Sequence, residues 1–307
     1  MDNVTHSLIG AVMGQAGLKW RTGLAMPALI IGANLPDVDA PCSIHGIESL
    51  AMRRGLSHGP IALIVLPLVL AALLIAWDRW QARRGKRPPD RLPIHAGWLI
   101  ALCYIGALSH PLFDWMNTYG IRLLEPFSSR WFYGDVLFIV DPWLLAMLIA
   151  GVWLSIRGEN RKAVRSPGPA RVAIVVALAY VGFNLVLSRA VAWQVRMDAP
   201  YPQVAVASPV PLAFWRREVL WRNADGTYGT IPCTLTSCRR YPLEVRRARL
   251  DDPLLAARAK VDPATRAFLF WSRMPLVEHR NGRAVLMDQR YMDRAGPSFS
   301  VDLGPVR

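Results

Sequence analysis

The run from Pro60 to Trp77 constrains the fold most strongly, because it consists almost entirely of Leu, Ile, Val and Ala and carries no charge. A helix needs about 20 such residues to cross a bilayer, so the sequence predicts a membrane helix here. Of the 307 residues, 53% are hydrophobic and only 19% are charged, whereas about a quarter are charged in a soluble domain. We therefore expect an integral membrane protein.

Other apolar runs predict the rest of a membrane domain, residues 1–193. Val4–Leu18 and Thr22–Asn34 are near or below the length of a span, so we expect a helical hairpin that is either tilted across the membrane or partly re-entrant. Three later runs predict membrane helices: Ile94–Phe113, Val136–Ile156 and Val172–Trp193. The expected fold class is membrane all-α, a polytopic bundle of about six apolar helices with a small C-terminal α+β domain.

That C-terminal domain is expected over residues 196–307, outside the membrane. Alternation predicts strands at Val204–Ala207, Phe214–Trp221, Tyr228–Leu235 and Ala284–Tyr291, and helical spacing predicts helices at Asp252–Lys260 and Pro263–Trp271. Cys233 and Cys238 form a disulfide if the segment faces an oxidising compartment, or they are two free thiols; both interpretations stay open.

Many of the Lys and Arg residues behind the net charge of +14 at pH 7 lie in short links between the apolar runs, and a surplus lies in the C-terminal part. Residues 78–93 and 157–171 are rich in Arg, which is the pattern of cytoplasmic loops. Nucleic acid is therefore not the expected partner. If both links are cytoplasmic, the other ends of the helices and the C-terminal domain lie on the opposite, periplasmic face.

His and Asp residues recur at those other ends. His110 and Asp114 are four residues apart, so on a helix they share one face. Similar groups occur at the ends of the neighbouring runs: His6, Asp37, Asp39, His58, Asp135 and Asp141. His with Asp suits zinc, iron, manganese or nickel in a site that keeps a position open for water. We expect a divalent metal ion, zinc before manganese or iron.

Several of these residues also have a plainer interpretation. His110 can bond to a backbone carbonyl, and Asp37 and Asp39 can make a turn after Pro36. His6 can be a solvated or capping residue, and Asp135 fits the positive end of a helix dipole. Ligation is favoured for His110 and Asp114, because ionisable groups at a membrane boundary are expensive unless they have a function.

The expected function is hydrolysis of an ester or phosphoester of a lipid or envelope molecule by metal-activated water. Arg54 or Arg122 would steady the developing negative charge, and Asp39 is a candidate catalytic carboxylate as well as a ligand. The alternative is a non-catalytic membrane adaptor or regulator in which the His/Asp cluster is structural. Transport is less favoured, because the polar groups gather at one end of the helices and not at the midplane.

Four blocks resemble a known family. They are THSLIG at Thr5–Gly10, LPDVD at Leu35–Asp39, RGLSHG at Arg54–Gly59 and SHPLFDWMNTYG at Ser109–Gly120. Together they resemble the bacterial inner-membrane proteins classed as membrane-bound metal-dependent hydrolases and also described as LexA-binding. The resemblance covers roughly Met1 to Trp193.

Several expectations follow from the resemblance alone. It implies an inner-membrane location, and a LexA-type repressor as a protein partner. It also implies metal or catalytic roles for seven residues: His6, Asp37, Asp39, His58, His110, Asp114 and Asp141.

Overall fold

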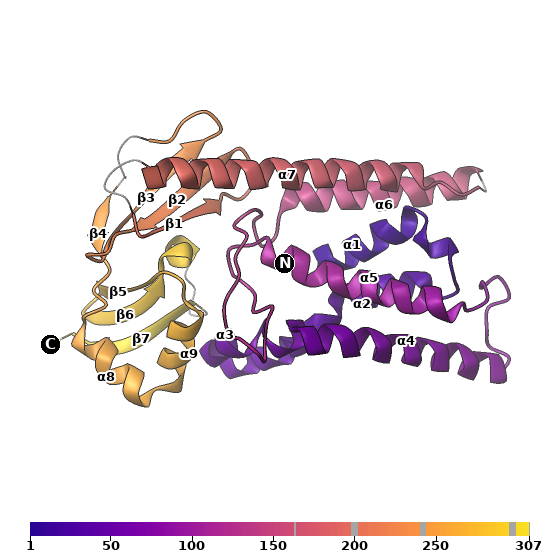
Figure 1. The fold of residues 1–307 in the computed structure, drawn as a ribbon, viewed down its shortest axis with the longest axis horizontal. Helices are drawn as coiled ribbons and strands as arrows, with labels where there is room; N and C mark the ends of the chain where they lie inside the picture. Colours follow the sequence, from indigo (N-terminus) through magenta and orange to yellow (C-terminus); the bar gives the residue numbers. More distant parts are fainter. Residues whose placement is uncertain (163, 198–201, 240–243, 295–298, 307) are drawn as a thin grey trace. The chain divides into compact units, whose positions relative to one another are not determined.

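The computed structural model describes residues 1–162, 164–197, 202–239, 244–294 and 299–306 (Figure 1). The chain divides into two compact units. The first comprises Met1–Asp39 and Arg54–Asn184, and the second comprises Ala40–Arg53 and Leu185–Arg307.

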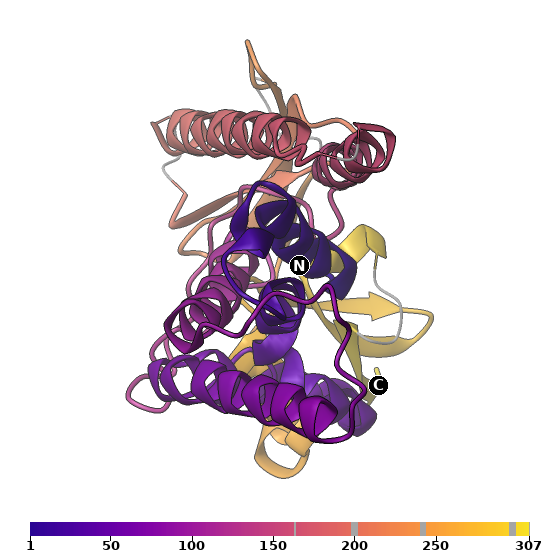
Figure 2. The same cartoon turned by 90° about the vertical axis from the view of Figure 1, so that its right-hand side faces the viewer.

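The first unit is helical. Its elements are α1 (Asn3–Gln15), η1 (Leu18–Trp20), α2 (Ala25–Asn34), the start of η2 (Leu35–Glu48), η3 (Leu56–His58), α4 (Pro60–Arg83), α5 (Ala96–Trp115), α6 (Pro142–Lys162) and the first half of α7 (Gly168–Met197). Helix α6 lies beside that part of α7 in both views (Figures 1 and 2), and Ala170 of α7 donates its N–H to Ser155 of α6 at 3.0 Å.

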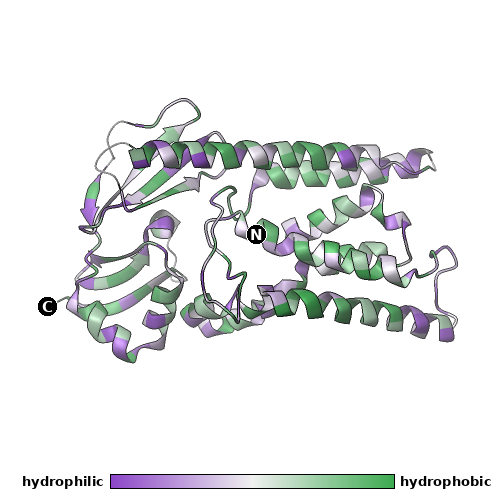
Figure 3. Ribbon diagram, in the orientation of Figure 1, coloured by the Kyte–Doolittle hydropathy of each residue, from purple (hydrophilic) through white to green (hydrophobic). Residues whose placement is uncertain are grey.

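Among the described residues, three helices are long and apolar enough to cross a membrane, and not about six as expected. They are α4, α5 and α7, and the colouring of Figure 3 shows that most of their residues are hydrophobic. Helices α1 and α2 have only 13 and 10 residues, or about 20 Å and 15 Å of length. Helix α6 has 21 residues, but its last turns carry Arg157, Glu159 and Arg161.

Glycines allow α1, α2 and α5 to pack with their backbones in contact. A Cβ at Gly106 of α5 would lie 2.7 Å from the Leu29 carbonyl oxygen of α2, and a Cβ at Gly10 of α1 would lie 2.6 Å from the same oxygen. Small residues serve this purpose between membrane helices generally. Leu29, Leu99 and Leu102 are fully buried in the adjoining core.

The helices of this unit bring their polar ends together. Helices α1, α4 and α6 begin at the end where α2 and α5 finish, and the basic links follow at the opposite end. The candidate ligands therefore meet because of the helix directions, although they are far apart along the chain.

The second unit holds α3 (Ser49–Met52), the end of α7 and two antiparallel sheets. The first sheet has the order β1-β2-β3-β4, with β1 (Val204–Pro209), β2 (Arg216–Arg222), β3 (Thr227–Thr234) and β4 (Val245–Arg247). Leu187, Val191 and Val195 of α7 pack on this sheet. The second has the order β5-β6-β7, with β5 (Pro275–Arg280), β6 (Arg283–Asp288) and β7 (Ser300–Pro305).

Two short helices, α8 (Pro253–Val261) and α9 (Pro263–Trp271), precede β5, and η4 (Gln289–Arg294) follows β6. The C-terminal part thus combines helices and strands as expected: β1, β2, β3 and β6 lie close to the expected strands, and α8 and α9 lie close to the expected helices. Strands β4, β5 and β7 were not expected. Cys233 at the end of β3 is joined to Cys238 by a disulfide, while Cys42 and Cys103 are free.

Candidate metal centre

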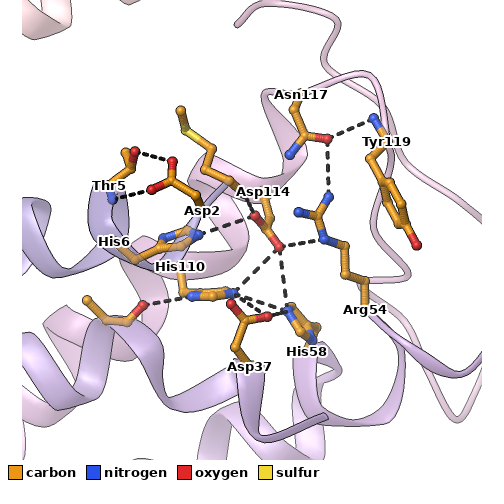
Figure 4. A network of polar contacts seen from close by, with 12 residues as sticks. Asp2, Thr5, His6, Asp37, Arg54, His58, His110, Asp114, Asn117 and Tyr119 are labelled. Atoms are coloured by element: carbon orange, nitrogen blue, oxygen red, sulfur yellow. Dashed lines mark hydrogen bonds and ion pairs between the residues drawn. The ribbon is translucent and has the colours of Figure 1, made fainter. Parts of the chain in front are cut away.

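Four side chains of the helical unit converge on one buried point (Figure 4). Asp37, His58, His110 and Asp114 each offer one ligand atom, and these atoms lie within 4.8 Å of one another. Asp37 comes from the turn after α2, His58 from the turn before α4, and the other two from the last turns of α5. All four are buried.

The hydrogen bond of His110 determines its tautomer. Its Nδ1 lies 2.7 Å from the carbonyl oxygen of Ala33, which can only accept, so Nδ1 carries the proton. In the neutral ring, Nε2 is then a bare acceptor. That atom points at the cluster, 3.5 Å from Asp114 Oδ2 and 3.8 Å from Asp37 Oδ1.

His58 is held in the same tautomer by a different group. The Ser57 hydroxyl donates to Asp39 Oδ2 at 2.9 Å and therefore accepts from His58 Nδ1, also at 2.9 Å. The Nε2 atom of His58 is then the unprotonated ring nitrogen, 3.6 Å from Asp114 Oδ2 and 3.9 Å from Asp37 Oδ1. A metal-bound histidine commonly makes such a second hydrogen bond.

The two Nε2 atoms lie 3.1 Å apart, with the two carboxylates beside them. This arrangement gathers the lone pairs of two imidazoles and the charge of two carboxylates around one point, where a cation would be attracted. Two imidazoles and two carboxylates form a donor set that a divalent transition metal prefers. The residues present therefore fit a metal ion.

Positive groups already surround Asp114. Arg54 Nε lies 3.0 Å from its Oδ2, and the Met1 α-amino group contacts its Oδ1. The Arg54 guanidinium also bonds to Asn117 Oδ1 at 3.2 Å and stacks over the Tyr119 ring at 4.5 Å. Arg54 is thus fixed on every side and orients Asp114.

His6 joins the cluster from α1, whose start is capped by Asp2. Its ring stacks on His110 at 3.8 Å between centroids, and its Nε2 lies 3.3 Å from Asp114 Oδ1. Its buried Nδ1 has no hydrogen-bond partner among the described residues. His6 therefore borders the four converging ligands.

Asp39 lies one step outside the four. Its Oδ2 accepts from the Ser57 hydroxyl and from the Arg54 backbone N–H at 2.8 Å. Its side chain is 11% exposed, compared with 0% for the side chain of His58.

Asp141 and Asp135 lie outside this group of four. Asp141 accepts from the Leu144 N–H at the start of α6 and from the Tyr180 hydroxyl, at 3.0 Å each. This capping role accounts for its place in an apolar run. Asp135 is buried in the loop before α6 with a backbone φ of 56°.

Arg122 lies in the loop after α5. Burial lowers the pKa of its guanidinium, while Glu125, Tyr119 and Asp39 oppose that shift. Its Nη1 is 3.3 Å from Glu125 Oε1, and its backbone N–H bonds to the Arg54 carbonyl at 2.9 Å. A Cβ at Gly55 would lie 2.4 Å from Nη2 of Arg122, so Gly55 makes room for this arginine.

Several contributors to the site were not expected from the sequence. Ser57, Asn117 and the Ala33 carbonyl fix the ligands or their partners, yet none is a candidate ligand by residue type. Ser57 precedes His58 directly in the RGLSHG block, and this position is the sequence feature that could have identified Ser57 as part of the site. The Ala33 carbonyl has no sequence signature, because it depends on the packing of α2 against α5.

Comparison with known proteins assigns the chain to a family. No curated protein and no solved structure shows significant similarity to it. The family model described as YdjM inner membrane protein matches residues 1–191, which include every residue of the cluster and confirm the family that the four sequence blocks resemble. The chain therefore belongs to the YdjM family of inner membrane proteins.

Proposed function

We propose that the protein is a membrane-bound, metal-dependent hydrolase that acts on an ester or phosphoester of a lipid or envelope molecule. The observation that carries this proposal is the convergence of four acceptor atoms, from Asp37, His58, His110 and Asp114, in a buried site. A divalent ion there would supply Lewis-acid activation of water and of the scissile group.

The residues of the chain have separate tasks in this proposal. His58 and His110 present lone pairs in fixed tautomers, and Arg54 holds Asp114 in place. Asp39, the more exposed carboxylate, would take up a proton from the attacking water. Arg122 would steady negative charge that develops on the substrate.

We infer that the cluster faces the periplasm. The basic links lie at the opposite end of the helices, which supports a cytoplasmic location for that end. The disulfide between Cys233 and Cys238 supports an oxidising compartment for the C-terminal domain.

Burial favours a second candidate, a non-catalytic membrane protein in which the metal is structural. His58, His110 and Asp114 are 0% exposed, whereas a hydrolase must admit substrate and water. The two candidates differ in two properties. A structural metal should be needed for the protein to stay folded, and only a hydrolase should turn over a substrate in a way that depends on Asp39.

The first experiment is elemental analysis of detergent-purified protein beside Asp37→Asn and His110→Ala. We expect stoichiometric transition metal in the wild type and its loss from both variants, because each removes one of four converging ligands. Asp90→Asn and His45→Ala change exposed residues of the same types and should keep the metal. Absence of metal from every sample of folded protein would overturn the metal site.

A second measurement separates the two candidates. For a hydrolase, Asp39→Asn should retain the metal and the unfolding temperature but lose turnover of chromogenic phosphoesters or esters in mixed micelles. No turnover by the metal-loaded wild type, together with unfolding when a chelator removes the metal, would favour the structural candidate.

A further inference from the structure

A basic cavity lies at the end of the helical unit opposite the metal cluster. It has a volume of about 650 Å³ and is lined by the turn after α1 and the link before α7. The lining side chains that matter here are Trp20, Arg21, Arg165 and Arg171. The family resemblance and the proposed hydrolase activity use none of these residues.

The three arginines are held without carboxylate partners. Arg165 stacks over the Trp20 ring at 5.0 Å and Arg21 over the Trp98 ring at 4.7 Å. Arg171 donates its Nε–H to the Ala16 carbonyl at 2.9 Å, which leaves its terminal nitrogens available. In the described part of the chain, none of the three forms an ion pair.

The carboxylate of Glu159 on α6 does not pair with these arginines. Glu159 Oε2 lies 2.6 Å from Lys19 Nζ and is thereby occupied. Three guanidinium groups around one cavity repel each other unless an anion enters, and the planar fork of Arg matches the oxygens of a phosphate.

The surroundings of the cavity point to a lipid as the source of that phosphate. Trp20 and Trp98 lie beside these arginines, and tryptophan is enriched at membrane–water interfaces. On α7, immediately after Arg171, Val172 and Val175 are 62% and 65% exposed. These valines offer an apolar surface for acyl chains beside a cationic surface for a headgroup.

We propose that this cavity binds the phosphate headgroup of an anionic phospholipid. The site is independent of the metal cluster, since the two lie at opposite ends of the unit. Basic pockets between membrane helices are suited to such headgroups.

The test uses detergent-purified full-length protein in mixed micelles that contain phosphatidylcholine. Phosphatidylglycerol is titrated into this sample, and the bound lipid is counted by native mass spectrometry. We expect one tightly retained phosphatidylglycerol and about 30-fold weaker binding by Arg165→Gln/Arg171→Gln. Arg79→Gln/Arg83→Gln removes the same charge from exposed positions on α4 and should stay within about twofold of wild type.

Arg165→Gln alone is a control for misfolding of the double variant, because it keeps the Arg171 contact with Ala16. We expect it to bind the lipid about fivefold more weakly than wild type. A second arm adds inorganic phosphate. Unchanged binding in the double variant, or equal losses in the two double variants, would overturn the site. Displacement of the lipid by inorganic phosphate at equal concentration would overturn the lipid as the ligand.

Discussion

His58 and His110 differ in what holds their Nδ1 atoms, although both present Nε2 to the cluster. His110 donates to a backbone carbonyl, whose position follows from helix packing. His58 donates to the Ser57 hydroxyl, which in turn donates to Asp39 Oδ2. The orientation of His58 therefore depends on one small side chain that is not itself a ligand.

Ser57→Ala should weaken metal binding by about tenfold to a hundredfold, the usual effect of losing such an orienting partner. Metal retention during a titration with chelator measures it. Ser109→Ala is the matched control, because the Ser109 hydroxyl bonds within its own helix to Gly106 at 2.7 Å. Equal losses in the two variants would show that Ser57 does not orient His58.

Asp288 gives the C-terminal domain an acid-sensitive contact. Burial opposes its ionisation, but the charge and hydrogen bonds of Arg290 and a hydrogen bond from Ser272 outweigh burial and lower its pKa from 3.8 to about 2. The folded-state pKa lies below the unfolded one, so this contact is fully present above about pH 4 and is lost as the pH falls toward 2. It contributes about 2 kcal/mol.

Trp271, over which Arg290 stacks at 5.0 Å, reports that loss in denaturant titrations followed by fluorescence between pH 5 and pH 2. Asp288→Asn should abolish this component of the pH dependence, and exposed Asp225→Asn should leave it in place. A steep loss in Asp288→Asn that equals that of wild type would contradict the assignment.

At the scale of elements, the close packing of α2 and α5 positions the site. Gly106 lies one turn before His110, and its contact with α2 brings the Ala33 carbonyl within reach of the His110 ring. Any side chain at Gly106 would separate the two backbones and move His110 away from its partner.

Gly106→Ala should therefore lower the free energy of unfolding by about 1–3 kcal/mol through overpacking and reduce metal content. Gly182→Ala on α7 is the control, because a Cβ there meets nothing within 4 Å; it should be neutral or stabilise by up to about 1 kcal/mol. Thermal unfolding in detergent compares the two. A Gly106→Ala protein as stable and as metal-rich as wild type would refute the packing argument.

Sequence patterns predicted the elements unevenly. The uncharged runs gave α4, α5 and α7, because membrane length and apolarity are local properties. They overstated the number of spans, because α1 and α2 are apolar along their length and yet short, and because α6 ends in charged residues. Strand β4 was not predicted because it has only three residues. Strand β5 was not predicted because it begins with a proline, which weakens the strand pattern.

The ligands were predictable to the extent that they sit in local patterns. His110 and Asp114 share a helix face, and Asp37 and His58 end or precede apolar runs. Asp141 looked equivalent by the same criterion. Its partner Tyr180 is 39 residues away, and such long-range hydrogen bonds have no local signature.

At the scale of the molecule, the disulfide provides a test of orientation. In a Cys42→Ser/Cys103→Ser background, a membrane-impermeant maleimide should label Cys233 and Cys238 in intact cells only after an impermeant reductant has been added. The bridge blocks both thiols, and the predicted periplasmic location exposes them once reduced. Labelling that needs permeabilised cells would place the domain on the cytoplasmic side.

The shortness of α1 and α2 has a consequence for the order of events during synthesis. These helices are made before α5, which begins at Ala96, yet Gly32 of α2 packs against the backbone of α5 and Gly10 of α1 packs against α2. Neither can settle in the bilayer as an independent span. The N-terminal hairpin must therefore wait near the membrane surface or the insertion machinery until α5 has been made, and only then can His6 and Asp37 reach the partners that complete the cluster.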